Sequence, residues 1–198
     1  MISKLSSKIV GVLINQSVIE YENKELYDYG FFILFSQILY FIIALIVGIL
    51  FNVILQSIVF YISFQFIRRY AGGYHASTEI RCEIMSTLSI AVCISLIKLL
   101  QIYDYKMVLI IISVISIICI ICLCPLDTPE KPLSEKEFNY FRKISWLILF
   151  IITASIIISY ILEWNFVFVP CCLSLILESI LISAGKMKKL LDNKKKKI

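Results

Sequence analysis

Histidine is almost absent from this chain of 198 residues, since His75 is the only one. Cys119, Cys122 and Cys124 have a spacing that metal sites use, but no second cysteine pair or histidine lies in a matching polar segment. A structural zinc ion needs four ligands. The sequence therefore argues against a metal centre, and cysteines within apolar runs are expected to act as small hydrophobic residues.

Charged residues are also scarce, at 17% of the chain against 60% hydrophobic residues, and the mean hydropathy is +0.92. Soluble domains carry only about 45–50% apolar residues, so this composition excludes a soluble single-core protein and indicates a bilayer protein. Residues 1–30 lack the compact apolar run and small-residue cleavage site of a secretory signal. We therefore expect the N-terminus to remain in the mature protein.

Long apolar stretches predict the transmembrane helices, each of which needs about 20 predominantly apolar residues. The first two stretches are separated only by Asn52, which predicts a tight helical hairpin, and the second is short. The predicted fold is an all-α, polytopic membrane protein with six transmembrane helices behind an N-terminal amphipathic helix. The six stretches are residues 31–51, 53–67, 84–102, 107–125, 144–162 and 165–184.

The distribution of lysine and arginine predicts the orientation of these spans. With six spans, every basic residue except Lys98 and Lys106 falls on one side of the membrane. Positive residues are retained in the cytoplasm, so both termini are predicted to be cytoplasmic. The chain is expected to form a single membrane domain, residues 1–198, made of an interfacial helix and linker (1–29), a six-span bundle (30–185) and a basic tail (186–198).

The two ends of the chain leave alternatives open. Residues 1–20 place apolar side chains at spacings of three and four, which is typical of an amphipathic helix. Such a helix lies on the inner leaflet or packs on the bundle, and the sequence favours neither. The tail from Lys186 to Lys197 is too polar to pack in an apolar core, so contact with anionic lipid headgroups is its expected role.

The polar loop of residues 68–83 follows the second stretch and holds the side chains that are suited to catalysis. His75 and Cys82 lie there together, and Arg81 and Glu83 flank the cysteine. Ser77 or Thr78 is suited to cap a helix that runs into the third span, which would place Cys82 about one turn past the helix start. At that position the helix dipole favours a thiolate. A cysteine beside an imidazole has the parts of a nucleophile and its base.

The spacing of these two residues sets a condition on that chemistry. On a straight helix His75 and Cys82 would lie about 10.5 Å apart along the axis, too far for a hydrogen bond. Gly72 and Gly73 admit backbone angles that other residues avoid, and so allow the chain to reverse before the helix begins. A structural role for His75 and simple packing for Cys82 remain the alternatives.

The loop and the overall layout resemble the accessory gene regulator B (AgrB) family of membrane endopeptidases, which process the precursor of a cyclic quorum-sensing peptide. Arg69, Gly72-Gly73, His75-Ala76 and Cys82 carry the resemblance. A second match is the proline-punctuated, basic stretch from Pro125 to Leu133. The resemblance implies a multi-pass protein of the bacterial cell membrane that acts without a cofactor and forms a homodimer.

The resemblance also implies the mechanism and the substrate. Cys82 would be the nucleophile and His75 the base of a cysteine peptidase acting on a short, AgrD-like precursor with an acidic tail. The tail would leave, the rest would stay attached as a thioester, and a thiolactone ring would then close. Arg68, Arg69, Lys131 and Lys136 are candidates for binding the acidic tail. Alternatively, each of these four is only an orientation charge.

Three questions are left open by the sequence. The group that orients His75 is not identified, and Glu79, Asp127, Glu130 and Gln65 are all possible partners. Glu178 lies inside the sixth span, where an ionisable residue is costly and faces a basic partner, a substrate path or a symmetry mate. Finally, a small transporter and a non-catalytic assembly factor are the rival functions, although no matching pair of broken spans supports transport.

Overall fold

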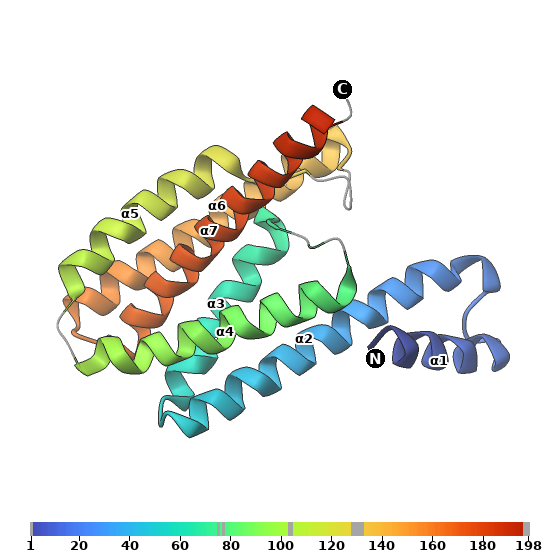
Figure 1. The fold of residues 1–198 in the computed structure, drawn as a ribbon, viewed down its shortest axis with the longest axis horizontal. Coiled ribbons are helices and arrows are strands. Elements are labelled where there is room, and N and C mark those ends of the chain that lie inside the picture. The colour runs from blue at the N-terminus through green and yellow to red at the C-terminus, as the bar shows by residue number, and fades with distance from the viewer. Residues whose placement is uncertain (1, 75, 77, 103–104, 128–132, 196–198) are drawn as a thin grey trace. The chain divides into compact units, whose positions relative to one another are not determined.

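The computed structural model describes residues 2–74, 76, 78–102, 105–127 and 133–195, and in these ranges it contains helices and no β-strand (Figure 1). The all-α prediction is thereby confirmed for the described part of the chain. The elements are α1 (Ile2–Asn15), the short 3-10 helix η1 (Tyr21–Asn23), α2 (Lys24–Leu50), α3 (Ile54–Ala71), α4 (Glu79–Ile102), α5 (Lys106–Leu123), α6 (Glu135–Ile161) and α7 (Asn165–Lys195).

Five of these helices are long and apolar enough to cross a membrane: α2, α4, α5, α6 and α7. The predicted second span corresponds to α3, which has 18 residues and a lower apolar content because it includes Arg68 and Arg69. Its length is about 27 Å at 1.5 Å per residue, close to the hydrocarbon thickness of about 30 Å. The second predicted span, and with it the total of six, therefore stays a prediction.

The chain divides into two compact units, Met1–Ile43 and Ala44–Ile198. In the first unit α1 buries Ile2, Ser6 and Val10, which recur every four residues, while Leu5 and Val12 are exposed. The interfacial role predicted for this helix stays a prediction. The second unit holds the residues of the candidate site described below.

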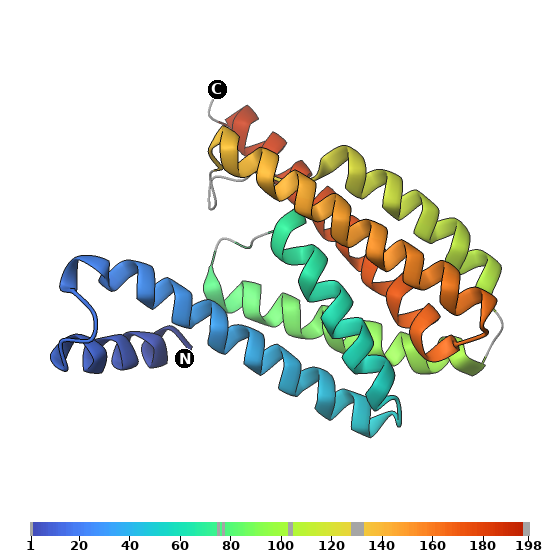
Figure 2. The ribbon, with the colours of Figure 1, turned by 180° about the vertical axis from the view of Figure 1, so that it is seen from behind.

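Helix α7 is the centre of the second unit, where it contacts α3, α4, α5 and α6 (Figures 1 and 2). Most of its side chains between Phe168 and Ile182 are buried. The sequence divided this region into an apolar span, residues 165–184, and a basic tail. In the structure one helix runs through both and continues to Lys195. An apolar run marks the part of a helix in hydrocarbon, and backbone hydrogen bonding continues beyond it.

The short helix α3 packs on α7, α6 and α4, and one stripe of its residues is buried. The stripe follows the spacing of three and four that a buried helical face requires. It consists of Ser57, Phe60, Tyr61, Phe64, Ile67 and Ala71. This packing fixes the end of α3, from which the polar loop departs.

Several helix ends meet at one end of the second unit. Hydrogen bonds join the segment after α5 to the end of α3, and the segments after α3 and α5 to the second half of α7. Helix α6 begins nearby with a capping box, in which Ser134 and Glu137 bond each other's backbone N–H groups. We call this region the loop end of the bundle and define it by residues 68–74, 124–127 and 181–189.

Candidate active site

The polar loop begins with a reversal at two glycines. Helix α3 ends at Ala71, and the Gly72 N–H donates to the Arg68 carbonyl over 3.2 Å. Gly72 has a φ of 83° and Gly73 a φ of 146°, angles that residues with a Cβ rarely adopt. The chain therefore turns away from the axis of α3 at this point.

Arg68 holds the loop after the turn. Its Nη1 donates to the Gly72 carbonyl over 2.9 Å, and its Nη2 donates to the Tyr74 carbonyl over 2.6 Å. The guanidinium also fills the space beside Gly73 that a side chain there would occupy. The planar fork of arginine suits two carbonyls at once. Arg68 was a candidate for substrate binding, and in the structure it is engaged with its own loop.

Helix α7 holds the loop from the other side. The Tyr74 N–H donates to the Leu181 carbonyl over 2.9 Å, and the Lys188 ammonium lies 5.7 Å from the centre of the Tyr74 ring. Gly185 permits this approach, since a Cβ there would lie 2.9 Å from the Gly73 carbonyl carbon. The basic segment after the predicted sixth span therefore packs against the loop.

The segment after α5 docks on the same place. The Leu126 N–H donates to the Ala71 carbonyl over 2.8 Å, which ties this segment to the end of α3. Lys189 Nζ donates to the Asp127 carbonyl over 2.7 Å and pairs with Asp127 Oδ2 at 3.1 Å. Residues 128–132 lie outside the described residues. The two stretches that carry the family resemblance thus meet in space, although they are far apart in the sequence.

Cys82 lies in the first turn of α4. The Cys82 N–H donates to the Thr78 carbonyl over 3.1 Å, and the Thr78 hydroxyl accepts from the Arg81 N–H over 3.4 Å. The threonine thus caps the helix, one of the two possibilities that the sequence offered. Ser77 and His75 lie outside the described residues. The thiol belongs to a half-exposed residue, which leaves it open to a substrate.

The other six cysteines have different surroundings. Cys93, Cys171 and Cys172 are buried within helices, and the Cys119 sulfur lies 3.2 Å from the Ser183 hydroxyl. Cys122 is exposed on α5, and Cys124 is buried just past the end of that helix. Of the seven, only Cys82 occupies the first turn of a helix.

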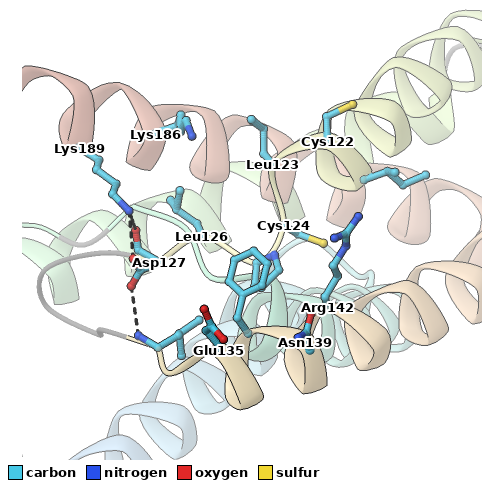
Figure 3. A pocket seen from close by; sticks show the side chains of 14 residues that line it. Cys122, Leu123, Cys124, Leu126, Asp127, Glu135, Asn139, Arg142, Lys186 and Lys189 are labelled. Carbon is cyan, nitrogen blue, oxygen red and sulfur yellow. Dashed lines mark hydrogen bonds and ion pairs between the residues drawn. The ribbon is translucent and has the colours of Figure 1, made fainter.

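A cavity of about 750 Å³ opens at the loop end beside these contacts (Figure 3). Arg142 reaches it from α6 and lies 4.7 Å from the centre of the Trp146 ring. The cavity is lined by Ile121, Cys122, Leu123, Cys124, Pro125, Leu126, Asp127, Leu133, Glu135, Phe138, Asn139, Arg142, Lys186 and Lys189. The sequence showed Arg142 only as an orientation charge and Lys186 only as part of the lipid-contacting tail, because nothing local reveals that α6 and α7 bring them to one cavity.

The remaining candidates are placed as follows. Arg69 and Lys136 are exposed, and Lys131 lies outside the described residues. Of the possible partners of His75, Asp127 pairs with Lys189, and Gln65 is half-buried on α3. Glu130 and the side chain of Glu79 lie outside the described residues.

Comparison with known proteins decides the family. The family described as Accessory gene regulator B matches residues 6–184, which include both stretches that meet at the loop end. The chain belongs to the accessory gene regulator B family. Membership gives this AgrB family protein a role in the accessory gene regulator system of quorum sensing, in which the family is known for peptide processing.

Two curated relatives support the assignment. The chain is 29% identical over 178 residues to "Putative AgrB-like protein" of Clostridium perfringens (strain SM101 / Type A), a match that covers 84% of this chain and 83% of the relative. It is 28% identical over 176 residues to "Putative AgrB-like protein 2" of Clostridium perfringens (strain 13 / Type A), which covers 83% and 82%. No solved structure matches this AgrB family protein.

Proposed function

We propose that this protein is a membrane cysteine endopeptidase that removes the C-terminal tail of a short autoinducer-peptide precursor. Cys82 is the nucleophile and His75 is the general base and acid. The observation that carries the proposal is the position of Cys82, half-exposed in the capped first turn of α4 and directly after a loop that is held by Arg68 and α7. Family membership supplies peptide processing as the chemistry.

The reaction proceeds in two steps. His75 takes the Cys82 proton, the thiolate attacks a peptide carbonyl, and the amide bond breaks as His75 gives its proton to the leaving amine. The precursor then remains on Cys82 as a thioester. A thiol within the bound peptide attacks that thioester, which forms the thiolactone and frees Cys82. Thioester formation from an amide is uphill, so removal of the released tail draws the reaction forward.

Substrate contacts are proposed for the four basic side chains that the sequence indicated as candidates. An acidic precursor tail would be attracted to Arg68, Arg69, Lys131 and Lys136 through long-range electrostatics. Arg69 and Lys136 are exposed and so have their charge available to a partner. Arg68 already donates to two loop carbonyls, so its contribution to substrate binding is expected to be smaller.

The experiment that tests this function uses the purified protein in liposomes with a labelled precursor. We expect one specific cut, with the N-terminal fragment recovered as a cyclic thioester by mass spectrometry. Precursor movement across the bilayer without cleavage would identify a transporter instead. Binding without either cleavage or movement would identify an assembly factor.

The proposal includes an orientation with both termini in the cytoplasm of a bacterial cell. Five basic residues lie at the loop end, Arg68, Arg69, Lys186, Lys188 and Lys189, whereas Lys98 and Lys106 lie near the α4–α5 connection. The positive-inside rule therefore places the loop end, and the site with it, in the cytoplasm. Lysines of the last helix are then close to anionic lipid headgroups, and the small residues of the spans allow helix contacts in a homodimer.

Labelling from one side of the membrane tests this orientation at the two ends of α6. Glu163 and Lys136 are exposed and lie at opposite ends of that helix. A membrane-impermeant maleimide added to whole cells is expected to label Glu163→Cys, and to label Lys136→Cys only after permeabilisation. Peptide mass spectrometry identifies the labelled site. The reverse pattern would contradict the proposed orientation.

A further inference from the structure

One carboxylate lies deep in the bundle without a hydrogen-bond donor among the described residues. Glu178 on α7 is 0% exposed, and among the described residues neither of its carboxylate oxygens has a hydrogen-bond donor. Its charged neighbour is Arg68, whose Nη1 lies 3.9 Å from Glu178 Oε2. A buried carboxylate is costly unless it is paired, and inside a membrane such residues mark functional sites. Packing alone does not account for Glu178.

Arg68 connects this carboxylate to the reactive loop. The same guanidinium that faces Glu178 donates to the carbonyls of Gly72 and Tyr74, on the two sides of Gly73. Because the five N–H groups of arginine form a rigid fork, a change in the position of the guanidinium moves both carbonyl contacts together. Glu178 and the loop are therefore linked through one side chain.

We propose that Glu178 is a positioning residue for the reactive loop and acts through Arg68. Its negative charge holds the guanidinium between α3 and α7, and the guanidinium fixes the loop up to Tyr74, the residue before His75 in the chain. The Arg68 side chain is 19% exposed, so it has a route to water. Without the carboxylate, the guanidinium lowers its free energy by turning toward water, and both carbonyls then lose their donor. This proposal rests on the peptidase function proposed above and adds a residue of the last helix to it.

The test compares Glu178→Gln with a matched control on the same helix. Glu178→Gln keeps the shape of the side chain and removes its charge. Ser174→Ala is the control, because Ser174 is equally buried on α7 but its hydroxyl donates only to the Cys171 carbonyl of its own helix. Arg68→Lys is the second variant, since lysine keeps the charge beside Glu178 but lacks the fork that bridges two carbonyls.

Three measurements are made on each full-length variant in detergent or liposomes. Hydrogen exchange reports the Tyr74 amide, which donates to Leu181. The rate of alkylation by iodoacetamide reports Cys82 without any substrate, and peptide mass spectrometry separates it from the exposed Cys122. Cleavage of the labelled precursor gives kcat and KM separately. For Glu178→Gln we expect faster exchange at Tyr74, an altered alkylation rate at Cys82, and a kcat about 10-fold to 100-fold lower with little change in KM. Ser174→Ala is expected to match the wild type in all three.

The outcomes separate this proposal from the function on which it rests. Unchanged exchange at Tyr74 in Glu178→Gln overturns the positioning role, even where cleavage falls. Absence of cleavage by the wild-type protein overturns the peptidase function, and the exchange data still decide whether Glu178 holds the loop. If Glu178→Gln does not fold, Arg68→Lys gives the decision, because wild-type exchange at Tyr74 in that variant contradicts the proposed link.

Discussion

Replacing Cys82 with alanine is expected to abolish cleavage of the precursor while the protein still inserts and folds. The alanine removes the atom that attacks the carbonyl, and loss of a nucleophile lowers kcat by at least about 1,000-fold. The fold is expected to survive, because Cys82 is half-exposed in the first turn of α4 and the capping contacts of that turn come from Thr78. Precursor cleavage is measured by mass spectrometry at equal amounts of folded protein, and His75→Ala is expected to give the same loss.

The control for this variant is Cys122→Ala. Cys122 is the exposed cysteine of α5, so the change removes an accessible thiol outside the proposed catalytic pair. We expect Cys122→Ala to cleave at the wild-type rate. Cleavage that persists in Cys82→Ala and disappears in Cys122→Ala would contradict the assignment of the nucleophile.

Replacing Gly73 with alanine is expected to have the second-largest effect. The φ of 146° at this position disfavours any side chain, and a Cβ there would overlap the Arg68 guanidinium. The backbone strain costs about 1–3 kcal/mol. Expelling Arg68 leaves Glu178 buried without its partner, a type of loss that costs about 3–5 kcal/mol. We expect activity about 100-fold lower and a lower thermal unfolding midpoint.

Gly30→Ala is the matched control for Gly73→Ala, because a Cβ at Gly30 would meet no atom within 4 Å. It is expected to keep activity and stability. The double variant Gly73→Ala with Glu178→Gln adds a sharper test. If both changes act through Arg68, the double variant loses little more activity than Gly73→Ala alone, since effects on one shared network are not additive. Fully additive losses would contradict a shared route.

The helices were largely predictable, but their ends were not. Hydropathy predicted the fifth span to begin at residue 144, whereas α6 begins at Glu135. The signal for that start is in the sequence, because Ser134 and Glu137 have the spacing of a capping box. No comparable signal marks the end of α7, which continues through a run of lysines that are good helix formers.

The loop end shows why the site was only partly predictable. The Gly72-Gly73 pair and the cap of α4 are local features, so the sequence was sufficient to indicate a turn and a helix start there. The contacts of Ala71 with Leu126 and of Tyr74 with Leu181 join segments far apart in the chain. Local patterns contain no information on which helix ends meet. For the same reason, the sequence identified Glu178 as an anomaly but could not choose Arg68 as its partner.

The most direct test of the central claim is to look for the bond that the mechanism requires. The purified protein is mixed with a precursor whose internal thiol is replaced, so that ring closure is blocked and the acyl group stays on the enzyme. We predict that the protein gains the mass of the precursor without its tail, that peptide mapping places this mass on Cys82, and that hydroxylamine removes it. Precursor cleavage without any such adduct on Cys82 would contradict the account.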